Sequence, residues 1–503
     1  MAQEFEIHRE TPLSTTPEQI RDVADTDHTQ VLVVGGGPAG STVATLLARE
    51  GLDVTLMEKA VFPRYHIGES LLPSCMPVLD LLGAREKIDA YGFQRKRGAY
   101  LTWGEEQWEF NFGDPSENGP YSYQVLRSDF DHLLLEHAKD QEVKVMEGVE
   151  VKRLQFDDGR PCAAVWSPAD QSSKIRETTF DFLIDASGRA GLMTTRHLHN
   201  RRYHEAFKNI AIWGYWEGVK KLPVGPEGAI VVCSVPDGWY WGIPLHDGTL
   251  SVGLVTHKEV FKAKREEGAS ADDVYHETIR KCPAIADMLA PAELVTPLRI
   301  EQDYSYTTES FTGPGYFLVG DAACFLDPLL STGVHLAMFS ALLAAASLTS
   351  VIRGEVEEKE AADLYEHAYR QAYLRLLVLV SEFYQQHSGK ESYFREAQRL
   401  TLHDCNVDDL RQMFVNIVSG IEDLRDTQAT LDLVRTSAAK AHMEQIAWAQ
   451  HKVKFDSMAS GEQETVQARI KFMESFMHFA RSPEEAVRGL YVVTKPRLGL
   501  ARR

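Results

Sequence analysis

The sequence predicts an α/β fold with a parallel sheet, an inserted antiparallel sheet and a helical C-terminal region. Three observations lead to this prediction. First, the apolar run at residues 30–34 is followed by a glycine-rich turn, a helical pattern at residues 41–50 and a second apolar run at residues 53–57. Second, short runs of aromatic and β-branched residues fill the chain from about residue 95 to 300. Third, the pattern from about residue 355 onward is almost entirely helical.

These patterns divide the chain into three predicted parts. Residues 1–29 are polar and acidic and are expected to form a flexible extension. Residues 30–354 are expected to form a nucleotide-binding domain, with the antiparallel sheet inserted at about residues 95–130 and 200–300. The helical region then occupies residues 355–503.

Composition excludes several classes of function. The chain has 503 residues and a net charge of −20, and a surface of this sign does not favour binding to nucleic acid. Its six cysteines include no C-x-x-C pair, so we expect reduced thiols and no metal site. We see no secretory signal and no apolar run that suits a membrane span, and therefore expect a soluble, cytoplasmic protein.

The glycine-rich turn is a dinucleotide-binding fingerprint. Gly35, Gly37 and Gly40 satisfy G-x-G-x-x-G, and the turn also contains Pro38 and Ala39. Such glycines permit a tight turn, a close approach to a pyrophosphate and close packing of the helix on the strand. Glu58 ends the second strand, where a carboxylate accepts hydrogen bonds from ribose hydroxyls. The context of strand, turn, helix and acid makes a purely structural turn improbable.

Three further segments resemble those of glutathione-reductase-type FAD-binding proteins. One strand runs into a turn after Asp185, and a later strand ends in Gly320-Asp321. The resemblance implies that Asp321 binds the ribityl or pyrophosphate region of FAD and that Arg127 contacts the flavin. We find a single dinucleotide fingerprint in the sequence, so we expect reduced FAD to come from a separate flavin reductase.

A heptapeptide distinguishes this chain from other flavoproteins. Residues 238–244 read Gly-Trp-Tyr-Trp-Gly-Ile-Pro, which matches G-W-x-W-x-I-P at every fixed position. This motif resembles that of the flavin-dependent halogenases. In that family the tryptophans, here Trp239 and Trp241, are thought to keep the substrate away from the flavin. The main alternative is an FAD-dependent aromatic hydroxylase (a monooxygenase), which needs its substrate beside the flavin. Two others are a prenyl-chain reductase, which shares the G-E-S-type loop but not this heptapeptide, and a flavoprotein scaffold without turnover.

The resemblance also implies a halide site. Ser331, Thr332 and Gly333 resemble the halide-binding S-T-G turn of the family, and amide groups at a helix N-terminus favour an anion. The flanking Pro328 and Val334, together with Gly333, are expected to contact the flavin. Next to this turn His335 is expected to be a buried, hydrogen-bonded histidine.

The position immediately before this turn suggests which ring reacts. Tryptophan halogenases carry a glutamate there, and this chain has Leu330. A phenol or a pyrrole supplies its own activation through the ring heteroatom. We therefore expect one of these rings, with a phenol as the first choice, rather than free tryptophan.

Lys96 is the expected catalytic lysine. It lies in a G-F-x-x-K-R-G stretch that resembles phenol-type bacterial halogenases, in which hypohalous acid passes from the flavin to a lysine beside the substrate. Lysine suits this role because burial can lower its pKa. Residues 62–73 resemble the same subgroup and are expected to lie along the flavin, with Arg64 and Ser70 in contact with it.

Together these resemblances imply an FADH2-dependent halogenase. It is expected to use O2 and chloride or bromide, through hypohalous acid, to halogenate an electron-rich aromatic ring. The substrate is a free small molecule or one bound to a carrier protein, which the C-terminal helices are then expected to dock. The sequence does not distinguish chloride from bromide.

Overall fold

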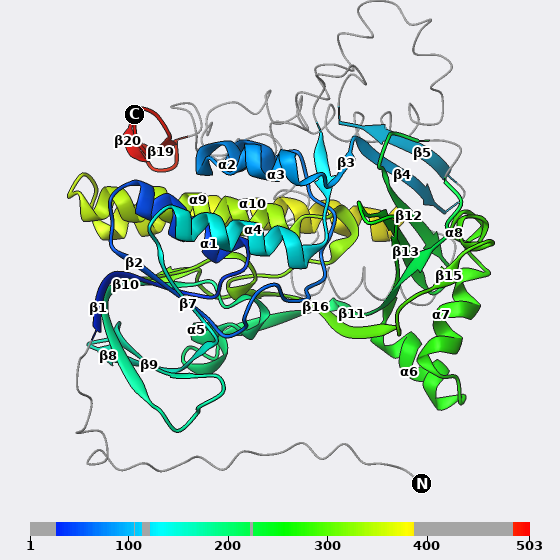
Figure 1. Cartoon of the computed structure of the whole chain (residues 1–503), viewed down its shortest axis with the longest axis horizontal. Helices are drawn as coiled ribbons and strands as arrows, with labels where there is room; N and C mark the ends of the chain where they lie inside the picture. The colour runs from blue at the N-terminus through cyan, green and yellow to red at the C-terminus, as the bar shows by residue number, and fades with distance from the viewer. Residues whose placement is uncertain (1–26, 105, 113–120, 222–224, 387–485) are drawn as a thin grey trace, which may run out of the picture.

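The computed structural model describes residues 27–104, 106–112, 121–221, 225–386 and 486–503. Within these residues the chain forms two large sheets with helices packed against each (Figure 1). The predicted flexible extension lies outside the described residues except for residues 27–29. Those three residues already belong to the first strand, so the predicted boundary was three residues late.

The first sheet contains the predicted parallel strands. Its central strand, β1 (Asp27–Val34), pairs in parallel with β2 (Val54–Glu58) on one side and with β10 (Arg176–Asp185) on the other. The sheet continues in parallel through β7 (Lys144–Glu147) and β18 (Tyr316–Leu318). The carboxyl ends of these strands share one edge, which is where open α/β sheets bind their ligands. Its antiparallel strands are β8 (Val149–Asp157), β9 (Arg160–Pro168) and β17 (Thr312–Gly313).

Helices pack against this sheet and against one another. Helix α1 (Pro38–Arg49) follows the glycine turn and begins earlier than predicted because Pro38 suits the first helical position. It packs against α4 (Arg127–Asp140) and α9 (Gly333–Ile352), and α9 packs in turn against α10 (Glu358–Gln386). The smaller helices of this half are α2 (Cys75–Leu82), α3 (Arg85–Tyr91), α5 (Leu192–Arg196) and the 3-10 turns η2 (Gly188–Ala190), η3 (Gly320–Ala322) and η4 (Pro328–Leu330).

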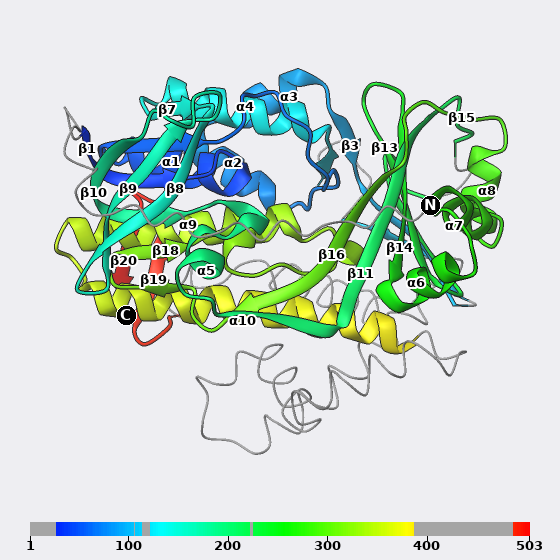
Figure 2. The same ribbon diagram turned by 90° about the horizontal axis from the view of Figure 1, so that it is seen from below.

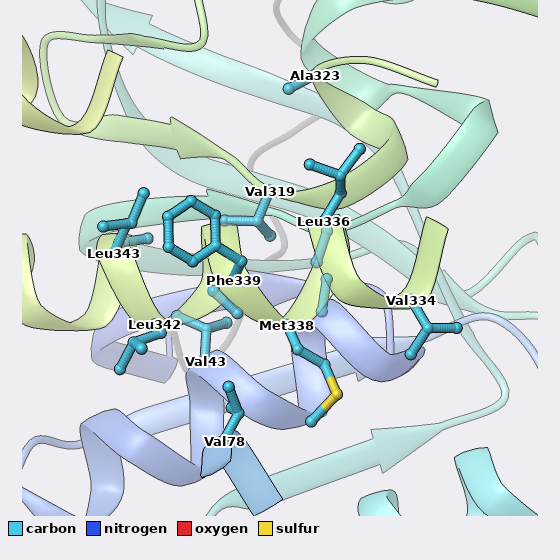
Figure 3. Packing of buried hydrophobic residues seen from close by; sticks show 14 of the residues in the cluster. Val43, Val78, Val319, Ala323, Val334, Leu336, Met338, Phe339, Leu342 and Leu343 are labelled. Atoms are coloured by element: carbon cyan, nitrogen blue, oxygen red, sulfur yellow. The ribbon is translucent and has the colours of Figure 1, made fainter. Parts of the chain in front are cut away.

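Helix α9 forms the centre of the hydrophobic core. Its side chains Leu336, Met338 and Phe339 lie among residues of neighbouring elements, including Val43 and Val319 (Figure 3). The helix is long and apolar enough to cross a membrane by length and composition, but 89% of its most apolar stretch is buried inside the protein. Its hydrophobicity is therefore accounted for by core packing.

The second sheet carries the tryptophan motif. Its strands are β4 (Gly98–Trp103), β5 (Glu106–Asn111), β11 (Arg201–Glu217), β12 (Ile230–Val235), β13 (Gly238–Pro244), β14 (Leu250–His257), β15 (Glu293–Leu294) and β16 (Arg299–Thr308). Their order in the sheet is β15-β11-β14-β13-β12-β4-β5, and β16 also pairs with β11. The long strands β11 and β16 run side by side from the first half of the molecule into this sheet (Figure 2).

Alternation along β13 gives the second sheet two different faces. Trp239, Trp241 and Ile243 belong to the same hydrophobic cluster as the first sheet, whereas Tyr240 belongs to a separate cluster on the outer face. Tyr240 donates a hydrogen bond of 2.6 Å to the backbone oxygen of Tyr275. The outer face is covered by α6 (Lys258–Glu266), α7 (Ala271–Ile279) and α8 (Pro283–Leu289).

Two expectations about the fold were wrong in part. The inserted sheet is antiparallel except at one pairing, because β12 and β4 run in parallel. The C-terminal region is not helical throughout, since β19 (Leu490–Val493) and β20 (Gly499–Arg502) form a hairpin. The predicted helices at residues 387–485, and with them the expected carrier-docking helices, lie outside the described residues.

Candidate active site

The glycine turn has the geometry that a bound pyrophosphate needs. Gly35 has a φ of +108°, and a Cβ there would lie 2.2 Å from the backbone oxygen of Ala186. A Cβ on Gly40 would lie 1.8 Å from the backbone oxygen of Gly35. Only glycine fits at either position, so the turn holds α1 tightly against the sheet.

Glu58 occupies the predicted position at the end of β2. One carboxylate oxygen accepts a hydrogen bond of 2.6 Å from the amide of Gly36, and the other accepts one of 2.7 Å from the amide of Ala60. These bonds hold the carboxylate beside the glycine turn. It also lines the cavity described next, where a ribose hydroxyl would reach it.

A cavity of about 560 Å³ lies between the two sheets and brings most of the predicted site residues together. Its wall extends from the glycine turn, past the loop of residues 64–70, to the tryptophan strand and the start of α9. The predicted residues that line it are Gly35, Gly37, Pro38, Ala39, Glu58, Arg64, Ser70, Arg127, Trp239, Trp241, Asp321, Pro328, Ser331, Thr332, Gly333 and Val334.

Three predicted cofactor ligands do not line the cavity but shape its wall. Gly40 lets α1 approach the glycine turn, and Gly320 has a φ of +58° at the end of β18. Asp185 is fully buried and accepts hydrogen bonds from the amide of Ser187 (3.0 Å) and the amide of Met193 (2.7 Å). It therefore organises the turn after β10.

A buried ion cluster positions the two predicted arginines. Arg127 donates two hydrogen bonds, of 2.7 and 2.9 Å, to the carboxylate of Asp131 one helical turn later. Arg64 lies 3.1 Å from the same carboxylate. A third hydrogen bond, of 2.9 Å, joins Arg127 to the backbone oxygen of Ile67. The cluster attaches the loop of residues 64–70 to α4 along one side of the cavity.

The predicted halide turn lies at the N-terminus of α9. Ser331 has a φ of +58° in the left-handed region, which is uncommon for a residue with a side chain. It connects η4 to Thr332, the N-cap of α9. The Thr332 hydroxyl is buried and has no hydrogen-bond partner among the described residues. A buried polar atom beside unpaired helix amides suits an anion.

The two motif tryptophans are buried and held by hydrogen bonds. Their rings lie 6.1 Å apart, and Trp239 donates a hydrogen bond of 2.9 Å to the Tyr384 hydroxyl. Tyr384 donates in turn to a carboxylate oxygen of Asp327 at 2.8 Å. Trp241 donates to the Ser251 hydroxyl at 3.2 Å. The tryptophans therefore form a fixed wall of the cavity.

Lys96 does not line the cavity. It lies on β3 (Gln94–Lys96), which pairs with β6 (Ser122–Gln124), and its side chain is 1% exposed. Its ammonium donates a hydrogen bond of 3.0 Å to the backbone oxygen of Leu71. Glu69 and Ser70, just before Leu71, do line the cavity. The segment of residues 69–71 therefore contacts the cavity on one side and the lysine on the other.

Burial lowers the pKa of Lys96 to about 7 and raises the pKa of the neighbouring Cys75 thiol to about 12. The apolar surroundings disfavour the charged form of each group. At neutral pH the lysine is therefore available both as an amine and as an ammonium, whereas the thiol keeps its proton. The Phe112 ring lies 5.4 Å from the lysine nitrogen and completes its surroundings.

Sequence reasoning missed several cavity residues. His66, Glu69 and Trp213 line the cavity, as does Asp303 on β16. Glu69 lies in the loop that was expected to lie along the flavin, but its hydrogen-bond partner Tyr215 is far away in the sequence and could not be predicted from the loop itself. Burial and the nearby Asp327 raise the pKa of Asp303 well above the usual range of a carboxyl. His335 is buried, as expected, and its ring stacks on Phe339.

The cavity residues fit an FAD molecule. The glycine turn leaves no room for a Cβ at its first position, and the hydroxyls of Ser70 and Thr332 are buried without a partner among the described residues. A ligand that carries phosphate, ribose and a flat ring would supply those partners. Apolar groups dominate the wall between Trp213, Trp241 and Ile243, as a flavin ring requires.

Comparison with known proteins decides the family. The family model described as "Tryptophan halogenase" matches residues 30–120 and 114–424. The chain belongs to the tryptophan halogenase family. A tryptophan 2-halogenase of Chondromyces crocatus is 46% identical over 499 residues, which cover 94% of each protein. A flavin-dependent halogenase of Armillaria mellea is 38% identical over 433 residues, which cover 82% of this chain and 85% of the relative.

A solved structure agrees with the family assignment. The myxobacterial chondrochloren halogenase CndH, described as an FAD-dependent halogenase, is similar with a TM-score of 0.69 and 34% sequence identity. The match covers 81% of this chain and 96% of that one. The predicted flavin-dependent halogenase class, its use of FAD and halide, and its action on an aromatic ring are therefore confirmed.

The expected type of ring is not supported. The predicted phenolic substrate rested on Leu330, which replaces a glutamate of tryptophan halogenases. Yet the relative that is 46% identical is named for tryptophan.

Proposed function

We propose that this tryptophan halogenase family member adds chlorine or bromine to the five-membered ring of an indole, with tryptophan as the first substrate to test. The observation that carries the proposal is the 46% identity to a tryptophan 2-halogenase over 94% of both proteins. Leu330 is compatible with it. The five-membered ring is the more electron-rich ring of an indole, and in tryptophan its most reactive position, carbon 3, already carries the side chain. Carbon 2 is therefore the open position of that ring and depends less on an activating carboxylate than the positions of the six-membered ring.

The proposed halide site is the turn before α9. Reduced FAD from a separate flavin reductase, together with O2, supplies the oxidising power that converts halide to hypohalous acid. Ser331, Thr332 and Gly333 form the turn that holds the halide. The amide of Ser331 donates to the backbone oxygen of Pro328 at 2.9 Å, so the amides of Thr332 and Gly333 at the helix N-terminus are the proposed halide donors. The fixed wall of Trp239 and Trp241 keeps the aromatic ring out of the cavity, which disfavours hydroxylation.

Lys96 is the proposed catalytic residue on the other side of the segment 69–71. Its ammonium form donates a hydrogen bond to hypohalous acid, and its amine form accepts the halogen as a chloramine or bromamine. A pKa of about 7 makes both forms accessible near neutral pH. Either form presents an electrophilic halogen to the ring, which loses a proton after the new carbon–halogen bond forms.

Mass spectrometry tests the proposal directly. Tryptophan and a simple phenol are each incubated with the protein, FAD, a flavin reductase, NADH and either chloride or bromide. We expect tryptophan to gain one halogen, seen as its isotope pair, and NMR to place it on carbon 2. The Lys96→Ala variant should lose this product while FADH2 is still oxidised.

The other outcomes distinguish the alternatives. Halogenation of the phenol alone would overturn the indole proposal and restore the phenolic one. A product heavier by one oxygen would indicate a hydroxylase and contradict the role given to the tryptophans. As a matched control for Lys96, the exposed Lys262→Ala variant should keep the wild-type product.

A further inference from the structure

Glu69 is a buried carboxyl group that the halide and lysine roles do not use. It is 1% exposed and lines the cavity between the two sheets. One carboxylate oxygen accepts a hydrogen bond of 2.6 Å from the Tyr215 hydroxyl on β11. Burial raises the pKa of Glu69 to about 7, so the group can gain and lose a proton near neutral pH.

A chain of hydroxyl groups joins Glu69 to the surface. The Tyr215 hydroxyl lies 3.0 Å from the Tyr65 hydroxyl, and Tyr65 is 39% exposed whereas Tyr215 is buried. Trp213 donates a hydrogen bond of 2.6 Å to the Tyr65 hydroxyl. The guanidinium of Arg299 lies 3.7 Å from the centre of the Tyr65 ring and holds it at the surface.

The hydrogen bonds of this chain have one direction. Each tyrosine hydroxyl has a single proton, and that of Tyr215 is donated to the Glu69 carboxylate. Tyr65 must then donate its own proton to Tyr215, and it accepts the N–H of Trp213. Donors therefore point from the surface toward the carboxylate, which is the order needed to deliver a proton inward.

Charged groups around Glu69 come from several elements. Arg127 of α4 favours the carboxylate form of Glu69, whereas Asp247, in the turn between β13 and β14, favours the protonated form. On the other side of the relay, Arg299 of β16 faces Tyr65. His66 also lines the cavity, but burial lowers its pKa to about 4, so it is neutral and cannot deliver protons at neutral pH.

The reaction itself requires a proton from solvent. FADH2, O2, a halide ion and one proton give FAD, hypohalous acid and one water molecule. The wasteful alternative, in which FADH2 and O2 give FAD and hydrogen peroxide, consumes no proton. Delivery of a proton to the reacting oxygen therefore favours hypohalous acid over hydrogen peroxide.

We propose that Tyr65, Tyr215 and Glu69 form a proton relay that carries the proton consumed in each turnover from the surface to the flavin cavity. In each cycle the Glu69 carboxyl gives its proton to the oxygen that leaves as water. The carboxylate then takes a proton from Tyr215, which takes one from Tyr65, which is refilled by solvent. The proposal rests on the halogenase chemistry and not on the identity of the aromatic ring.

Variants of the two tyrosines test the relay. Tyr215→Phe and Tyr65→Phe are compared with Tyr203→Phe, an exposed tyrosine on the same strand β11. With FADH2, O2 and bromide at pH 8, hypobromous acid is trapped by a small 1,3-diketone and hydrogen peroxide is measured in parallel. We expect each relay variant to form hypobromous acid about tenfold more slowly and to release more peroxide, and the control to match wild type.

A titration without FAD gives a second readout. In the infrared spectrum of the apoprotein, the protonated carboxyl band of Glu69 is identified by its loss in Glu69→Gln. Tyr215→Phe should raise the pH at which this band disappears, because it removes the hydrogen bond that favours the carboxylate. Since Tyr65 is partly exposed, Tyr65→Phe tests the relay even if Tyr215→Phe does not fold.

The possible results separate the two proposals. If wild type forms hypobromous acid and both relay variants keep its ratio of hypobromous acid to peroxide, the relay is wrong and the halogenase chemistry stands. If wild type forms only peroxide, the halide and lysine roles fail together with the relay.

Discussion

At the residue scale, the least expected feature is the depth of Lys96. A lysine with 1% exposure and one hydrogen bond to a backbone oxygen is costly to bury in its charged form. The presence of a buried lysine despite this cost agrees with a role in chemistry rather than in stability. The motif around Lys96 predicts a catalytic lysine, but nothing in that motif showed that a segment of main chain separates it from the cavity.

Lys96→Met should separate stability from activity. A buried lysine with a pKa of about 7 instead of 10.5 destabilises the folded state most below pH 7, and this cost disappears as the pH rises through 10.5. We expect the variant to lose halogenation and to raise the free energy of unfolding at pH 7 by about 2 kcal/mol. The substitution does not leave the Leu71 backbone oxygen without a hydrogen bond, because the Ser122 hydroxyl also donates to it at 2.8 Å.

Urea unfolding of the two proteins at pH 7 and pH 10 checks this. The stability difference between variant and wild type should shrink toward pH 10. A difference that stays constant with pH would show that the lysine is not buried in the way described.

At the scale of elements, prediction succeeded where the pattern is local. The glycines and the acid at Glu58 are close in sequence, so β1, α1 and β2 were placed to within a few residues. The parallel pairing of β12 with β4 joins segments more than a hundred residues apart and leaves no periodic trace. The hairpin of β19 and β20 was missed because its short apolar run, flanked by Gly489 and Pro496, was read as part of a long helical pattern.

The turn at Ser331 provides an element-scale prediction. With a φ of +58°, Ser331→Gly should raise the free energy of unfolding by about 1 kcal/mol, and Ser331→Val should lower it by about 1–2 kcal/mol. The valine variant should also need more halide for half-maximal rate, because the turn that presents the amides is strained. Thermal unfolding and halide titrations measure the two effects.

Ser331→Ala is the matched control for this turn. It removes the hydroxyl but leaves the backbone preference almost unchanged. If alanine weakens halide binding as much as valine does, the hydroxyl and not the turn geometry binds the halide.

At the scale of the whole molecule, the two ends of the described chain are joined. Glu50, at the end of α1, forms an ion pair with Arg353 and accepts a hydrogen bond of 2.9 Å from the amide of Leu498. The amide of Leu500 donates to the Ser350 hydroxyl of α9 at 2.8 Å. The C-terminal hairpin therefore supports the two helices whose N-termini face the cavity.

Glu50→Ala should test this support. The change leaves the Arg353 guanidinium and the Leu498 amide without their partner, so we expect the free energy of unfolding to fall by about 2 kcal/mol. Glu360→Ala removes an exposed pair with Arg502 of the same hairpin and should cost less than about 1 kcal/mol. Equal losses in urea unfolding would show that the hairpin is held by its apolar contacts instead.

The protonated thiol of Cys75, beside Lys96, affects how fast the enzyme is inactivated by its own oxidant. In the proposed mechanism hypohalous acid is carried to Lys96, which is a neighbour of Cys75. Thiolates are the form of cysteine that such oxidants attack fastest. Because burial keeps the pKa of Cys75 near 12, almost every molecule holds the less reactive thiol at neutral pH. The same apolar surroundings that lower the pKa of Lys96 thus protect Cys75 from oxidation. We expect the number of turnovers before inactivation to fall in variants that admit water to these surroundings.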